Sequence, residues 1–232
     1  MPASALLLSD GQIDFNGVLC SSLSAAASAA RGIPRSANLM RASMVSAVCI
    51  GTNFTRANLE GVDLREADLS YACLRNARLT EADLESAKLE FAILSGASLE
   101  YCDLVGTDFS NADLKRIKAD GSIWKGSNLA KANFQQASLV RARFPEARLP
   151  EVIFDRCDLA HGVFEDAQLR GAVLTNANLL RAAFDRADLT DACLENANLY
   201  EAGFWDAVLL RTSWEGAEAA ESLLEQMSGG KR

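Results

Sequence analysis

Large apolar residues recur at every fifth position along most of this chain. From Leu39 to Trp214, in steps of five, 36 consecutive pentapeptides share one register. We number the positions in each pentapeptide 1 to 5, with the large residue at position 3. Position 1 is usually Ala, and position 2 is often Asp or Asn. A helix repeats every 3.6 residues and a strand every 2, so a period of five predicts neither element in its usual form.

This pattern predicts a four-sided coil with one pentapeptide on each side. Positions 1 and 3 would point inward, and Ala is needed at position 1 because the tube is narrow. Asp and Asn at position 2 suit the bent backbone, since their side chains bond to nearby amides. Four sides make a coil of 20 residues, and stacked coils pair like strands at about 4.8 Å. Residues 37–216 therefore predict about nine coils.

The motif A-[DN]-L-x-x, as in Ala67–Tyr71, resembles the pentapeptide-repeat family. The resemblance implies an all-β solenoid, a right-handed quadrilateral β-helix. The pattern departs from the family motif locally. The large and small positions are inverted at Ile117 and Ala119, and two prolines occupy position 4, at Pro145 and Pro150.

Every fourth pentapeptide falls on the same side of such a coil. One column of position-3 residues runs from Met44 to Phe204 in steps of 20, and from Trp124 onward it is entirely aromatic. We expect these rings to stack within the core, because aromatic pairs prefer offset-stacked or edge-to-face contacts.

The flanking segments lie outside the repeat. Residues 1–36 contain Asp10-Gly11 between two apolar runs, which predicts a hairpin, and an Ala-rich stretch, 21–31, that could form a short helix. We interpret 1–36 as an N-terminal cap, because solenoids need one. A targeting segment is the alternative.

Residues 217–232 predict a helix to about 227 that covers the last coil. Alternatively, this end also pairs two subunits. The residues predicted at this contact are Tyr200, Trp205, Leu210, Leu223 and Leu224.

The composition gives little support for a catalytic, metal or cofactor site. The six cysteines form no CxxC motif and the chain has one histidine, so we expect no metal site, no cofactor and no catalytic residue. Stacked acids such as Asp63 and Asp83 resemble a glycosidase pair in spacing, but a convex coil offers no cleft. No apolar run is long enough to span a membrane, and a reducing, cytoplasmic location fits the cysteine usage.

Most of the acidity falls on one side of the predicted coil. Of the formal net charge of −8, −6 lies on the Met44–Phe204 side. This balance argues against direct nucleic-acid binding and favours a non-catalytic scaffold that binds another protein through its acidic face. The resemblance implies an alternative, a DNA mimic that binds DNA gyrase or topoisomerase IV. The predicted contact residues are Asp63, Glu66, Asp83, Glu85 and Asp103.

Overall fold

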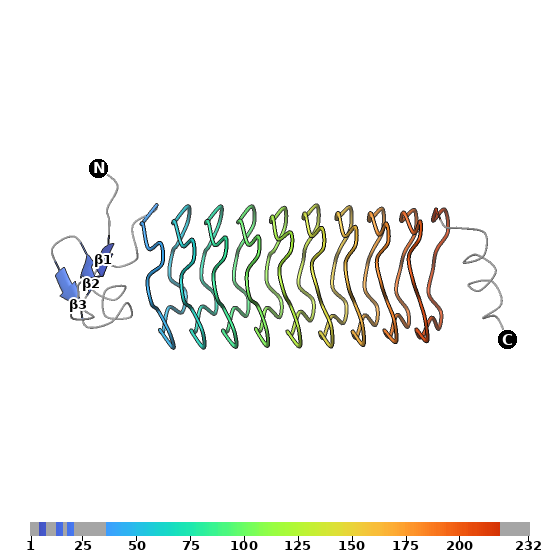
Figure 1. Ribbon diagram of the computed structural model, residues 1–232, viewed down its shortest axis with the longest axis horizontal. Coiled ribbons are helices and arrows are strands. Elements are labelled where there is room, and N and C mark those ends of the chain that lie inside the picture. The colour runs from blue at the N-terminus through green and yellow to red at the C-terminus, as the bar shows by residue number, and fades with distance from the viewer. Residues whose placement is uncertain (1–4, 8–12, 16–17, 21–35, 219–232) are drawn as a thin grey trace.

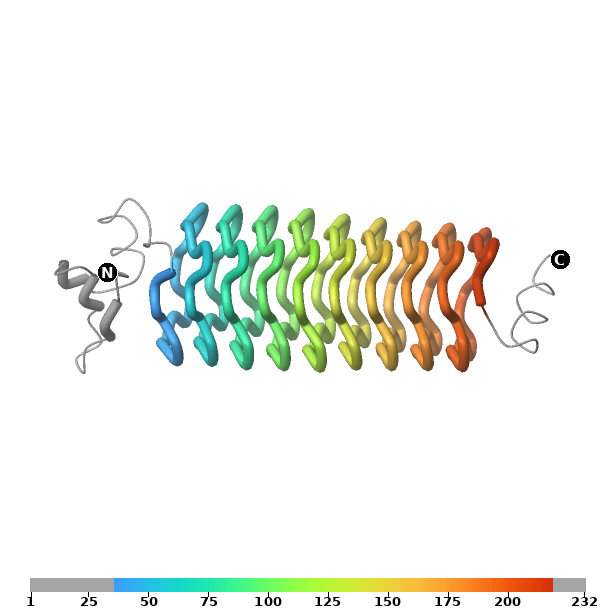
Figure 2. The backbone as a smooth tube through the Cα atoms, turned by 90° about the horizontal axis from the view of Figure 1, so that it is seen from above, coloured from blue at the N-terminus to red at the C-terminus, as the bar shows by residue number. Residues whose placement is uncertain are grey.

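The computed structural model describes residues 5–7, 13–15, 18–20 and 36–218. Residues 36–218 form one long rod of stacked coils (Figure 1). Each position-2 residue forms a parallel bridge with the residue 20 further on, from Asn38↔Asn58 to Asn198↔Glu218. The spacing never changes, so the coil has no bulge, and four bridges per turn give it the four predicted sides. The same regular coil is visible after a quarter turn about the long axis (Figure 2).

The corners explain why five residues are needed on each side. At every corner the position-3 carbonyl accepts a hydrogen bond from the next position-1 amide, as from Ala42 to Leu39 at 3.0 Å. The residue at position 5 has a positive φ, such as +56° at Arg41. This combination is the signature of a type II turn. Asp or Asn at position 2 accepts a bond from the position-4 amide, as Asp68 does from Ser70 at 3.0 Å.

The same turn explains the two prolines. Pro145 and Pro150 each occupy the second position of a turn, where their fixed φ is favoured. Proline has no amide hydrogen, so position 2 has nothing to cap there, and Arg143 and Arg148 replace the usual Asp or Asn. These departures from the motif therefore conform to the fold.

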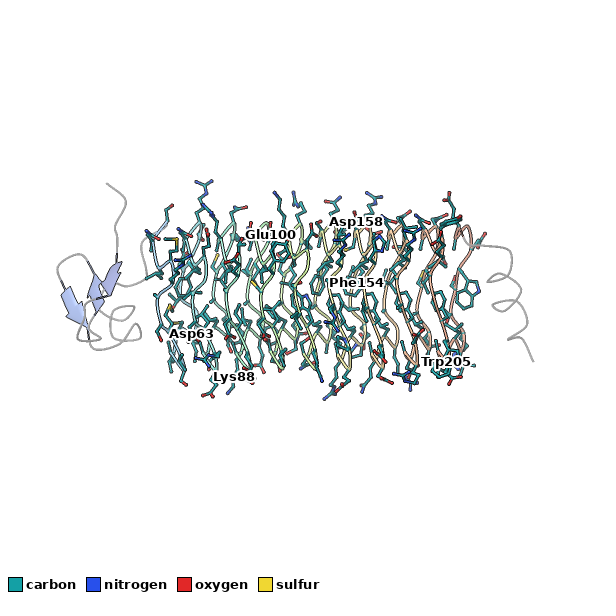
Figure 3. The ribbon with its side chains drawn as sticks, viewed as in Figure 1. Asp63, Lys88, Glu100, Phe154, Asp158 and Trp205 are labelled. Atoms are coloured by element: carbon teal, nitrogen blue, oxygen red, sulfur yellow. The ribbon has the colours of Figure 1, made fainter. Side chains whose placement is uncertain are left out.

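The core is a continuous column of buried side chains. The predicted aromatic stack is confirmed: the rings of Phe144 and Phe164 lie 4.9 Å apart and those of Phe164 and Phe184 4.8 Å apart, nearly parallel. Phe134 and Phe154 form a second column on another side, with ring centroids 4.9 Å apart. In Figure 3, Phe154 lies between the outer edges of the coil.

The irregular stretch at 117–127 accommodates the largest core residue. Trp124 is fully buried, and the preceding position 3 holds the small Ala119. The indole Nε1 donates to Ser122 Oγ at 2.7 Å, and Ser122 Oγ donates to the carbonyl of Ala119. The inverted pentapeptide thus offsets the volume of the tryptophan, and Ser122 satisfies its buried N–H.

Three short strands precede the coil: β1 (Ala5–Leu7), β2 (Ile13–Phe15) and β3 (Val18–Cys20). They form an antiparallel sheet in the order β1-β2-β3. The pairing of β1 with β2 agrees with the predicted hairpin, although its turn lies outside the described residues. The predicted helices at 21–31 and beyond 218 also lie outside them, so both capping predictions stay predictions. Within the described ranges, no helix is long and apolar enough to cross a membrane.

Candidate protein-interaction surface

Three aspartates form a row along the Met44–Phe204 side. Asp63 bridges to Asp83, and Asp83 bridges to Asp103, so these position-2 residues are neighbours on successive coils. Each carboxylate also accepts a bond from the amide two residues later, for example from Glu85 to Asp83 at 3.0 Å. Since one oxygen caps the turn, the backbone fixes the direction of each carboxylate. The row is therefore a rigid line of charge, and its first member, Asp63, lies near the N-terminal end of the rod (Figure 3).

Arg65 neutralises the first member of this row. Its Nε and Nη2 donate to the two oxygens of Asp63 at 2.9 and 2.8 Å, and Nε also lies 3.5 Å from Asp83. The hydrogen bonds from this guanidinium hold the pKa of Asp63 below its usual value. The sequence predicts Asp63 as an exposed contact and gives Arg65 no role. The sequence does contain a signal for this ion pair, since Arg65 follows Asp63 by two residues in the motif D-L-R.

The remaining members of the acidic face lie at the adjacent corner. Glu66 and Glu85 line a shallow hollow of about 190 Å³ together with Val45, Arg65 and Ser86. Glu66 also accepts a bond from Ser46 Oγ at 3.0 Å. Among residues 36–218, Glu85 and Asp103 form no ion pair. The structure thus brings the five predicted acids onto neighbouring coils and leaves four of them outside the tight Arg65–Asp63 pair.

Acids in the second half of the rod are arranged differently. There, Arg or Lys at one corner commonly pairs with Asp or Glu at the same corner of an adjacent coil. Examples are Arg181 with Glu201 at 2.6 Å, Arg211 with Asp191 at 2.5 Å, and Lys131 with Glu151 at 3.7 Å. Such pairs cancel charge locally. By contrast, Arg65 is the one cation that pairs with the five acids of the acidic face within the described residues.

The predicted C-terminal contact residues surround the last coil. Tyr200, Trp205 and Leu210 are all exposed, and each occupies position 4 of three successive corners. They therefore form a partial ring instead of one patch. Arg186 lies over the Trp205 ring at 5.8 Å. Leu223 and Leu224 lie outside the described residues, and the predicted dimer contact stays a prediction.

The side chains that could support chemistry are inert or dispersed. Cys49, Cys102 and Cys157 lie in the core, where burial raises the pKa of each thiol to about 12. Over the described part of the chain, no group of three or more His, Cys, Asp or Glu side chains could hold a metal ion. His161 occupies a corner at position 5.

Comparison with known proteins agrees with this geometry. A family model described as pentapeptide repeats matches residues 42–80, 77–116, 127–166 and 163–200, which together exceed half of the chain. The chain belongs to the pentapeptide-repeat family. The family and its solved members imply a right-handed β-helix solenoid and a non-catalytic role. Comparison with curated proteins gives no match.

Two solved structures are similar over most of their length. HetL, a pentapeptide repeat protein involved in heterocyst differentiation regulation in the cyanobacterium Nostoc sp. strain PCC 7120, is 27% identical, with a TM-score of 0.74. The match covers 83% of this chain and 93% of HetL. QnrB1, a plasmid-mediated fluoroquinolone resistance protein, is 16% identical in a trypsin-treated variant form, with a TM-score of 0.58, covering 83% and 92%. At that identity, QnrB1 supports the fold alone.

Proposed function

We propose that this protein is an interaction scaffold that binds a basic surface of another protein through its acidic face. The observation that carries the proposal is the set of carboxylates at Glu66, Asp83, Glu85 and Asp103, close together on a rigid coil and served by one arginine. Charges held on a fixed lattice lose little conformational entropy on binding. They also steer a basic partner at low ionic strength.

A four-site variant tests this proposal: Glu66→Gln, Asp83→Asn, Glu85→Gln and Asp103→Asn. Asn keeps an oxygen that can cap the turn, so the coil should be preserved. Proteins captured from a lysate of the source organism by wild type and by the variant would be compared by mass spectrometry at two salt concentrations. We expect a partner that wild type retains at low salt and the variant loses.

The control variant removes the same charge elsewhere. It neutralises four acids of the second half that already pair with a cation within the rod: Glu146, Glu151, Asp191 and Glu201. Equal loss of the partner in both variants would mean that net charge alone governs binding, and the proposed surface would be wrong.

Binding to DNA gyrase or topoisomerase IV is a second candidate. Its support is the row of aspartates at coil spacing, about 4.8 Å, on a fold shared with a fluoroquinolone resistance protein. Two observations weaken it: Arg65 interrupts the row, and ion pairs cancel charge over the second half. A supercoiling assay decides this case, because excess protein that leaves both enzymes unaffected would exclude the mimic.

A further inference from the structure

The side of the rod opposite the acidic face is basic in the same coils. Position-3 residues from Phe54 to Trp214 in steps of 20 define this side, which is two sides away from the Met44–Phe204 column. From residue 53 to residue 116, its turns carry four cations, and none of them forms an ion pair within residues 36–218. They are Arg56, Arg75, Lys115 and Arg116.

A hollow lies among these cations. It has a volume of about 280 Å³ and is lined by Arg75, Asn76, Ser95, Gly96 and Arg116. Gly96 occupies position 5 of its turn with φ +74°, and it lies on the coil between Asn76 and Arg116. Gly96 adds no side chain of its own to this corner, and Asn76 Oδ1 lies close to where a Cβ at Gly96 would stand. Its lining combines two guanidinium groups with an amide and a hydroxyl, all of which can donate hydrogen bonds.

Other corners of the rod show which group occupies the space beside a position-5 arginine. Position-5 residues 20 apart are neighbours on successive coils, and two arginines there pair with a carboxylate on the preceding coil. Arg211 Nε and Nη2 donate to the two oxygens of Asp191 at 2.5 and 2.7 Å. Arg186 donates to both oxygens of Asp166 at 2.9 and 2.8 Å. For Arg116 the corresponding neighbour is Gly96, which has no side chain to offer.

We propose that the Gly96 hollow binds a carboxylate group carried by an acidic segment of a partner protein. The incoming carboxylate takes the place that Asp191 takes beside Arg211, and Arg116 donates to it. Arg75 provides a second cation from the opposite wall. Charge-assisted, bidentate bonds of this kind are among the strongest hydrogen bonds in proteins. The rod would then have two binding surfaces of opposite sign on opposite sides, and this second site does not depend on the acidic face.

The test measures binding of a fluorescein-labelled hexaglutamate peptide to the full chain by fluorescence anisotropy at low salt. Arg116→Gln should weaken binding about tenfold or more, because it removes a charge-assisted pair. Gly96→Asp should weaken it similarly by supplying the carboxylate internally. Asp is accepted at this corner conformation, since Asp166 and Asp191 have φ of +56° and +60°. The side chain of Asn76 must shift to admit the new Cβ.

Three controls make the result decisive. Arg148→Gln removes the same charge from another side, where Arg148 makes no ion pair among the described residues, and should leave affinity unchanged. Equal weakening by this variant would show diffuse attraction and overturn the proposal. The acidic-face variant should bind the peptide at least as well as wild type, which separates this test from that of the proposed function. Finally, inorganic phosphate that displaces the peptide far more effectively than acetate would reassign the hollow to phosphate groups.

Discussion

Truncating one ring of the aromatic stack tests how the core is held together. Phe164 is fully buried, and it lies between Phe144 and Phe184 with ring centroids 4.9 and 4.8 Å away and interplanar angles of 4° and 6°. Phe164→Ala would leave a cavity that the two flanking coils cannot close, because their backbones are fixed by the ladder of hydrogen bonds. Phe→Ala in a core typically costs about 3–5 kcal/mol.

The stacking geometry places Phe164→Ala at the upper end of that range. Each aromatic pair adds about 0.5–1.5 kcal/mol beyond area burial, and Phe164 takes part in two parallel pairs. We therefore expect a loss of about 4–5 kcal/mol in the free energy of unfolding. With a urea m-value of about 2 kcal/mol/M, the unfolding midpoint should fall by about 2 M.

Phe91→Ala is the matched control for this experiment. Phe91 also stacks on one ring, that of Tyr71, at 5.1 Å and 3°, but it is 46% exposed. Its truncation should cost less than about 1 kcal/mol, since it leaves no cavity. Urea unfolding followed by circular dichroism measures both variants. If the two substitutions cost the same, burial in the column is not what stabilises the coil, and the reasoning is wrong.

Three further measurements address the turns, the charges and the buried thiols. Gly121→Ala should destabilise by about 1–3 kcal/mol more than Gly126→Ala in thermal unfolding, because both have positive φ but only at Gly121 would a Cβ meet a ring, that of Tyr101 at 2.7 Å. A carboxyl whose pKa is lowered by folding contributes stability at neutral pH that is lost as pH falls through the folded pKa. NMR titration should therefore find the pKa of Asp63 below that of a free Asp, and Arg65→Gln should raise it. The buried thiols should resist iodoacetamide at about pH 8 until the chain is unfolded, as mass spectrometry would show. They are Cys49, Cys102 and Cys157.

The sequence predicts the coil well because one local rule governs every side of it. The period, the inward positions and the aromatic column follow from side-chain size alone, and each coil meets only its neighbours. The turn type was harder to predict: eight of the residues with positive φ at position 5 are glycine, but the same conformation occurs at Arg, Glu, Asn and even Phe91, so glycine marks only some of the turns. Pro145 and Pro150 were the clearest evidence for it, yet they stand out in the sequence as departures from the motif.

The charged surface was less predictable than the coil, because a sum of formal charges on each side does not show which side chains form ion pairs. The sequence places Asp63 and Asp83 on one side, but only the structure shows that Arg65 contacts both. Conversely, Arg116 appears in the sequence as an ordinary surface cation, and its importance depends on the glycine one coil earlier. Because each coil has 20 residues, every residue lies beside the residues 20 positions before and after it in the sequence. Function in this rod is therefore best sought where that lattice leaves a charge without its usual counterpart, as at Asp103 on one side and Arg116 on the other.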